Sequence, residues 1–186
     1  IHHLLFKLFL HFFITCNKKA TETDSVIRSG DYPSETAPGD SAVIFAEDFI
    51  SIEENIRDAA LSPDGNHFFY SLTSRQRSFI LHVKRISGEW QNPEIAAFSN
   101  KYSNLEPAFN YEGDKLFFVS NRPKNDASES GDYDIWYVSA ENDFRNKPLN
   151  IGSPVNTSGN EFYPSLTKEG NLLFTAQRED SKGGED

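Results

Sequence analysis

The sequence contains no methionine, one cysteine and, beyond its first 15 residues, only two histidines. A single cysteine excludes a disulfide framework within the chain. With only His67 and His82 left to accompany it, a histidine/cysteine zinc cluster is not expected either. A translated chain begins with methionine, so we expect this sequence to be a piece of a longer one.

Positive charge is also scarce. The chain has 18 Lys and Arg residues against 28 Asp and Glu residues, and its formal net charge is −10. Nucleic acids and anionic membrane surfaces are bound by basic side chains, so this balance argues against both as partners. The 186 residues nevertheless include 16 Phe and 7 Tyr, which is enough apolar volume to form a folded core.

The motifs of common enzyme classes are absent as well. The sequence has no Gly-x-Ser-x-Gly elbow, no His-Glu-x-x-His pair, no phosphate-binding loop and no dinucleotide-binding glycine motif. His67 and His82 fall on expected strands, where we interpret them as packed or edge-exposed side chains and not as general bases. We predict no catalytic, cofactor-binding or metal-binding residue, and no cofactor.

The N-terminal segment predicts export. Residues 4–14 are an apolar run that is too short to span a bilayer, which takes a helix of about 20 residues, and residues 1–15 fit a signal peptide. The run ends at Cys16, in a pattern that resembles a bacterial lipoprotein signal and implies lipidation of this cysteine. The usual Leu and two small residues are replaced by Phe13, Ile14 and Thr15. The alternative is a cysteine that follows an ordinary signal by chance.

A polar segment follows, and it predicts a flexible tether. Residues 16–41 are rich in Ser, Thr, Gly and Pro and have almost no apolar periodicity. After a lipidated cysteine, such a tether holds the folded part away from the membrane. We expect the folded part to cover residues 42–186.

Three segments of this folded part repeat one pattern. An acidic residue, a glycine and an Asn or Asp separate two strand-like runs, at Gly65, Gly113 and Gly170. Glycine supplies the positive φ of a tight turn, so each segment predicts a β-hairpin. The glycines lie 48 and 57 residues apart. A repeat of this length indicates an array of similar units.

The second strand of each later hairpin is continuously apolar. Residues 116–119 and 172–174 do not alternate, so we expect both of their faces to be covered by other sheets. Third strands are expected at 79–83 and 134–138. Fourth strands are indicated by an aromatic residue followed by a proline: Trp90 with Pro93, and Phe144 with Pro148. Four strands in a repeat of about 50 residues are typical of a β-propeller blade.

These residues resemble the TolB-type, WD-repeat-like β-propeller family. Residues 62–65 (Ser-Pro-Asp-Gly) match the family's turn, 120–122 (Ser-Asn-Arg) its strand end, and 134–137 its third strand, whereas the second and third turns replace Pro-Asp. The resemblance implies an all-β chain of four-stranded antiparallel blades, incomplete here, with about two and a half blades and a stray N-terminal strand. The expected blades are about 56–100, 104–152 and 160–186.

The second repeat is lengthened by a polar insertion, and insertions in repeat proteins often lie on a binding face. The candidate contact residues in and after it are Asn125, Asp126, Glu129, Asp132 and Tyr133. One alternative is an ordinary solvated surface loop. Another is a Ca²⁺ site built from the carboxylates of Asp126, Glu129, Asp132 and Asp134, although their spacing does not match a calcium loop.

The function predicted from these features is a non-catalytic, lipid-anchored propeller at the outer membrane of a bacterial cell envelope. It would bind an envelope protein, a peptide or a glycan, and it would meet the membrane only through its lipid. The alternatives are the propeller domain of a larger serine peptidase or glycan-active hydrolase, and a lipoprotein that links to peptidoglycan. Because two and a half blades cannot close a ring, we also expect exposed strand edges and aggregation of this segment alone.

Overall fold

The computed structural model describes Asp40, Ile50, residues 55–124 and residues 130–178. Cys16, the predicted signal peptide and the predicted tether lie outside these residues, apart from Asp40. No helix among the described residues has both the length and the apolar character needed to cross a membrane. The elements are β1 (Asn55–Leu61), β2 (His67–Thr73), β3 (Ser78–Ile86), β4 (Glu89–Trp90), β5 (Glu94–Ile95), β6 (Asn104–Phe109), β7 (Lys115–Ser120), β8 (Asp134–Ser139), the 3-10 segment η1 (Glu141–Phe144), β9 (Leu149–Asn150), β10 (Glu161–Leu166) and β11 (Leu172–Ala176).

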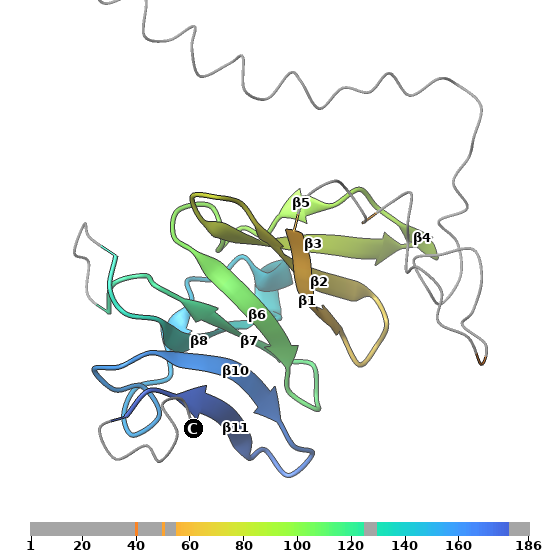
Figure 1. Ribbon diagram of the computed structural model, residues 1–186. Helices are drawn as coiled ribbons and strands as arrows, with labels where there is room; N and C mark the ends of the chain where they lie inside the picture. Colours follow the sequence, from red (N-terminus) through yellow and green to blue (C-terminus); the bar gives the residue numbers. More distant parts are fainter. Residues whose placement is uncertain (1–39, 41–49, 51–54, 125–129, 179–186) are drawn as a thin grey trace, which may run out of the picture.

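The strands form three antiparallel sheets (Figure 1). The first has the order β1-β2-β3-β4 with β5 also paired to β3, the second has the order β6-β7-β8-β9, and the third is the hairpin β10-β11. Apart from β5, each strand within a sheet pairs with the next along the chain, as in the blades of a propeller. The sheets also stack in sequence, since β6 contacts both β1 and β10. The prediction of an all-β chain with four-stranded antiparallel propeller blades is confirmed.

The fourth strands are shorter than the sequence suggests. In the first sheet, Pro93 separates β4 from β5, because proline has no N–H for the pairing with β3. In the second sheet, β9 begins after Pro148. The fourth strand that Phe144 and Pro148 indicate is therefore present as β9, whereas Phe144 itself belongs to η1 and its ring is buried among the side chains between the first two sheets.

The three hairpins are closed by the same turn. Gly65, Gly113 and Gly170 have φ angles of +70°, +75° and +84°. In each turn the glycine N–H donates to the carbonyl three residues earlier, at distances of 2.9, 3.1 and 3.0 Å. Neighbouring turns also approach each other closely. A Cβ added to Gly113 would lie 2.9 Å from the ring of Pro63, so no larger residue fits there without a shift.

Strand β7 has both faces covered, as its continuous apolar sequence predicts. Leu116 and Phe118 are fully buried in the core shared with the first sheet. Phe117 and Val119 point the other way, into the core shared with β10 and β11. Alternate side chains of one strand therefore contribute to two different cores.

Strand β11 has a similar sequence but only one covered face. Leu172 and Phe174 pack against the second sheet. Leu173, between them, is 56% exposed. The expectation that both faces of 172–174 are covered is therefore wrong within the described residues. The physical reason is that no described sheet packs on the face of β11 that carries Leu173.

The innermost strands of the three sheets share an irregularity. Asp58 in β1, Glu106 in β6 and Tyr163 in β10 each have a positive φ, between +52° and +56°, and each stands seven residues before its hairpin glycine. The strand pairing shifts register at each of these places. In the second and third sheets the next residue is proline, which cannot donate to the ladder and is favoured at bulges.

Two ends of the stack can be distinguished. The hairpin end carries the three glycine turns and η1, as shown by the hydrogen bond from Ala140 N–H to the carbonyl of Asp114 (2.8 Å). The connector end carries the link between β7 and β8 and the segment 151–160. There Glu161 N–H donates to the carbonyl of Tyr133 (2.8 Å). Asp132 and Tyr133, the described residues of the predicted binding loop, lie at the connector end.

Candidate functional site

Only part of the predicted binding loop belongs to the described residues. Asn125, Asp126 and Glu129 lie outside them. Asp132 and Tyr133 are half-buried at the connector end. The Tyr133 ring packs against Phe162 of the third sheet, with ring centroids 5.4 Å apart. This ring therefore joins two sheets.

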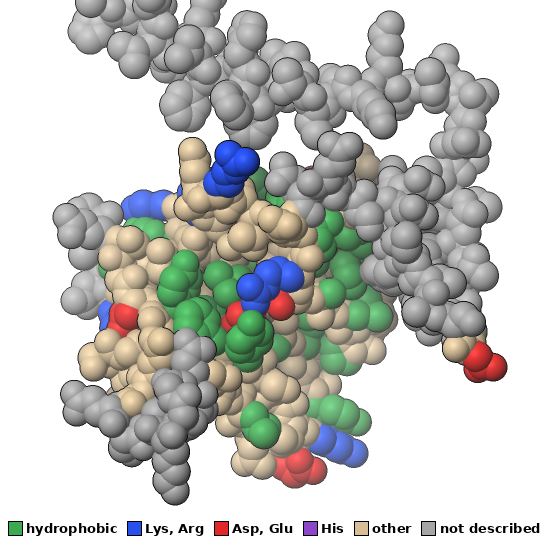
Figure 2. Space-filling view, viewed as in Figure 1, with side chains coloured by type: hydrophobic (Ala, Val, Ile, Leu, Met, Phe, Trp, Pro, Cys, Tyr) green, Lys and Arg blue, Asp and Glu red, His purple; other side chains and the backbone are tan. Residues whose placement is uncertain are grey.

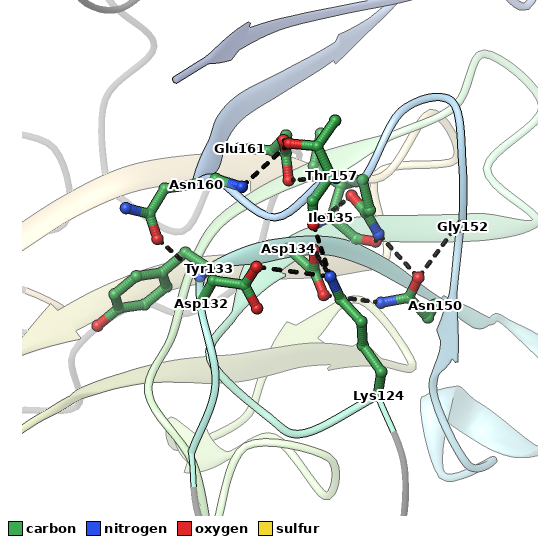
Figure 3. Close-up of polar contacts among 12 residues, drawn as sticks. Lys124, Asp132, Tyr133, Asp134, Ile135, Asn150, Gly152, Thr157, Asn160 and Glu161 are labelled. Atoms are coloured by element: carbon green, nitrogen blue, oxygen red, sulfur yellow. Dashed lines mark hydrogen bonds and ion pairs between the residues drawn. The ribbon is translucent and has the colours of Figure 1, made fainter. Parts of the chain in front are cut away.

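A lysine occupies the space between the two described carboxylates of this loop (Figure 3). Lys124 Nζ lies 3.5 Å from Asp132 Oδ2 and 3.2 Å from Asp134 Oδ1. Asp134, the first residue of β8, is completely buried and also accepts from Asn150 Nδ2 (3.1 Å). Burial raises the pKa of Asp134, and the hydrogen bond and charge of Lys124 oppose that rise. The cation that balances these carboxylates is a side chain of the protein itself.

Asparagine side chains fix the connector to β8, as Figure 3 also shows. Asn156 Oδ1 accepts from Ile135 N–H (2.9 Å), and Asn156 Nδ2 donates to the Ile135 carbonyl (2.8 Å). Asn160 Oδ1 accepts from Tyr133 N–H (2.9 Å). These side chains replace the backbone pairing that an irregular segment lacks. The connector end is thus a framework whose described polar groups bind one another.

A second group of polar residues lies where the three innermost strands meet. We call Arg57, Asp58, Glu106 and Tyr163 the inner-strand cluster. Arg57 Nη2 donates to Glu106 Oε1 and to the Tyr163 hydroxyl, both at 3.0 Å. Tyr163 N–H donates to Glu106 Oε2 (2.6 Å), and Arg57 Nε donates to Asp58 Oδ2. Glu106 therefore links β1, β6 and β10.

The members of this cluster differ in exposure. The Glu106 side chain is only 4% exposed, whereas that of Arg57 is 42% exposed, and Tyr163 is 54% exposed. Figure 2 shows basic, acidic and hydrophobic side chains meeting near the centre of the face on which β1, β6 and β10 lie in Figure 1. The surface offers a guanidinium and a phenol, which can donate hydrogen bonds and stack, above a buried acid.

The charge of Glu106 is affected by its position. Burial and the negative charge of Asp58 raise the pKa of Glu106, and burial is the larger of the two. The hydrogen bond from Tyr163 N–H and the positive charge of Arg57 lower it, and the net direction is upward. A buried carboxylate with a raised pKa at a surface site is a frequent feature of binding and catalytic sites.

Sequence reasoning did not find the inner-strand cluster. The available signal was the pair of dipeptides Glu106-Pro107 and Tyr163-Pro164, at the same place in two repeats. Arg57 carried no comparable signal, because its partners lie 49 and 106 residues further along the chain.

Comparisons with known proteins give structural neighbours only. No family model matches the chain, and no curated protein matches it. TolB from Acinetobacter baumannii is similar with a TM-score of 0.49 and 18% identity, over 71% of this chain and 29% of that one. A puromycin-hydrolyzing peptidase from Mycobacterium tuberculosis has a TM-score of 0.42 and 17% identity, over 66% of this chain and 20% of that one. The chain spans less than a third of either protein.

The fold class follows from the order and stacking of this chain's own sheets. The described chain consists of β-propeller blades.

Proposed function

We propose that this chain belongs to a non-catalytic, exported propeller of the TolB type, which binds a protein, peptide or glycan partner at the bacterial cell envelope. The observation that supports binding is the inner-strand cluster, where an exposed aromatic ring and a half-exposed guanidinium stand side by side. Tyr and Arg are the residue types that contribute most binding energy at protein interfaces.

The geometry favours binding over glycan cleavage. Glycosidases place two carboxyl groups on either side of the bond that they break. In the inner-strand cluster, both oxygens of Glu106 already accept hydrogen bonds, from Arg57 and from Tyr163 N–H, and the side chain is almost inaccessible. Glu106 therefore holds the donors in place, and the exposed Arg57 and Tyr163 make the contact.

A substitution pair tests the binding surface. Tyr163→Ala removes the exposed ring of the cluster, and Tyr111→Ala removes a ring of similar exposure (56%) at the hairpin end. Both variants are screened with the wild-type protein against peptide arrays, peptidoglycan fragments and envelope proteins. We expect Tyr163→Ala to weaken the captured interaction about tenfold or more, and Tyr111→Ala to leave it unchanged. Equal binding by all three proteins would contradict the proposed surface.

The envelope location is supported by the sequence alone, through the apolar run that ends at Cys16. Attached acyl chains bind membranes with about 0.8 kcal/mol for each buried CH₂ group. Metabolic labelling with a radioactive fatty acid tests this in a bacterium that expresses the protein from its natural start. The wild-type protein should incorporate label and sediment with membranes, and Cys16→Ser should do neither. Labelling of Cys16→Ser would contradict lipidation at this residue.

A further inference from the structure

Two histidines that the sequence places on separate strands meet between the first two sheets. His67 begins β2 and His82 lies on β3, and their Nδ1 and Nε2 atoms are 2.9 Å apart. The pairing of β2 with β3 places Lys84 opposite His67, so His82 is its diagonal neighbour on the same face. Asp143, from η1 of the second sheet, completes the group. The three potential ligand atoms all lie within 4.8 Å of one another.

Aromatic rings hold the two imidazoles in place. The Phe69 ring stacks on His82 with centroids 4.0 Å apart and an interplanar angle of 10°. The Phe144 ring meets both histidines edge-on, at 5.1 Å from His67 and 5.7 Å from His82. His82 is buried, and His67 is half-buried. Burial lowers the pKa of both imidazoles, that of His82 to about 3.

The Asp143 carboxylate lies on a segment with an unusual backbone conformation. Asn142, Asp143 and Phe144 have consecutive φ angles of +51°, +59° and +58°. Non-glycine residues rarely adopt this conformation, and three in succession are less common still. The conformation brings both the Asp143 carboxylate and the Phe144 ring to the histidine pair. Strained backbone of this kind is concentrated at functional sites.

The group has positive charge and open space beside it. Lys84 Nζ forms an ion pair with Asp143, and Arg145 Nε lies 3.6 Å from the same carboxylate. A cavity of about 130 Å³, lined by His67, Asp64, Glu112 and Phe144 among others, opens beside His67. This volume is sufficient for a water ligand. Two further carboxylates of the cavity lining, Asp64 and Glu112, favour a cation there.

We propose that His67, His82 and Asp143 bind one divalent transition-metal ion, such as Zn²⁺, and that this ion joins the first and second sheets. Two imidazoles and one carboxylate, with water in the fourth position, are a ligand set that zinc accepts in tetrahedral geometry. Metal–nitrogen bonds of about 2.0 Å at a tetrahedral angle separate the two nitrogens by roughly 3.3 Å. Small rotations of the two rings achieve this separation.

Binding requires two rearrangements. The facing nitrogens must both be unprotonated, so the hydrogen that one of them carries moves to the other nitrogen of the same ring. Lys84 must leave Asp143, and its side chain is already 26% exposed. Lys84 thus competes with the metal for the Asp143 carboxylate, and its replacement should strengthen metal binding.

Cobalt absorption and zinc calorimetry test this site in the full 186-residue chain. Tetrahedral Co²⁺ with nitrogen ligands absorbs visible light, so the spectrum reports on geometry as well as on binding. We expect stoichiometric Co²⁺ with a tetrahedral spectrum, displaced by Zn²⁺. His67→Gln and Asp143→Asn should weaken Zn²⁺ binding more than about tenfold, and Lys84→Gln should strengthen it several-fold.

The remaining histidines provide the matched control. A triple variant with His2, His3 and His11 replaced by Gln should bind Zn²⁺ as the wild-type protein does. His67→Gln and Asp143→Asn should melt within a few degrees of the wild-type protein in the presence of EDTA. When Zn²⁺ is added, the wild-type protein and the triple variant should melt higher, and His67→Gln and Asp143→Asn should not. Absence of a tetrahedral Co²⁺ spectrum would overturn the proposal, and so would binding that is lost in the triple variant and kept in His67→Gln.

Discussion

Strands β7 and β11 occupy the same place in their hairpins and have similar apolar sequences, but they have different surroundings. Each is the second strand of its hairpin. In β7 every residue after Lys115 is buried, and the strand contributes to two cores. In β11 only the last residue, Ala176, is buried, and Leu173 is exposed. The difference shows that stacked neighbours, and not the strand's own sequence, decide how much of an apolar strand is buried.

The arginines that follow these strands show the same contrast. Arg122, two residues after β7, is 9% exposed and donates to the Phe98 carbonyl, Asn104 Oδ1 and Ser120 Oγ. Its guanidinium also lies over the rings of Phe118 and Trp136. Arg178, two residues after β11, is exposed and donates to two carbonyls of the connector. One repeat position thus serves as a core residue in one sheet and as a surface residue in the next.

The largest expected effect is in the middle of β7. Phe118→Ala removes a fully buried ring that stacks on Phe98 with centroids 4.6 Å apart. We expect the free energy of unfolding in urea to fall by about 3–5 kcal/mol. Leu173→Ala in β11 is the control and should change it by less than about 0.5 kcal/mol. Similar losses in the two variants would show that the two strands are buried alike.

The arginine pair should give a smaller difference. Arg122→Ala leaves the Phe98 carbonyl and Asn104 Oδ1 without their buried donor, so we expect a loss of about 1–3 kcal/mol in the free energy of unfolding. Arg178→Ala at the equivalent surface position should lose no more than about 0.5 kcal/mol. Equal losses, measured by urea denaturation at pH 7, would contradict the difference in burial.

A pH series tests the buried acid between the inner strands. Because burial raises the pKa of Glu106 above its ordinary value of 4.5, the folded state binds this proton more tightly than the unfolded state does. Ionised Glu106 therefore opposes folding, and its contribution to stability falls as the pH rises from 4.5 towards its folded pKa. We expect the wild-type protein to lose stability relative to Glu106→Gln over this interval. A difference between the two that does not vary with pH would contradict the raised pKa.

The smallest predicted effect concerns the outer face of β11. Leu173→Gln should leave the melting temperature within a few degrees of the wild-type value, since the side chain is already 56% exposed. It should reduce self-association, because an apolar side chain beside an unpaired strand edge promotes contact between copies. Sedimentation velocity at increasing concentration measures this. Unchanged self-association would show that the copies do not meet through Leu173.

Much of this architecture could be predicted from the sequence, because hairpin chemistry is local. Gly65, Gly113 and Gly170 marked the three turns, and the apolar run after Gly113 indicated a strand with two covered faces. The exposed Leu173 could not be foreseen, since its burial depends on a neighbouring sheet and not on its own strand.

The candidate sites were less predictable for the same reason. His67 and His82 share one hairpin, so strand register alone could have placed them on one face. Asp143 reaches them from the second sheet, over a distance in sequence that no local pattern describes. Similarly, Arg57, Glu106 and Tyr163 come from three separate sheets.

Amide hydrogen exchange measured residue by residue tests the stacking most directly. If β7 lies between two sheets, the amides of Leu116–Val119 should exchange only through global unfolding, and their protection should match the free energy of unfolding measured in urea. The amides of Leu172–Phe174 should exchange faster, through local opening of the β10-β11 hairpin. Equal protection of the two strands, or a β7 that opens locally, would contradict a propeller in which stacked sheets cover both faces of β7.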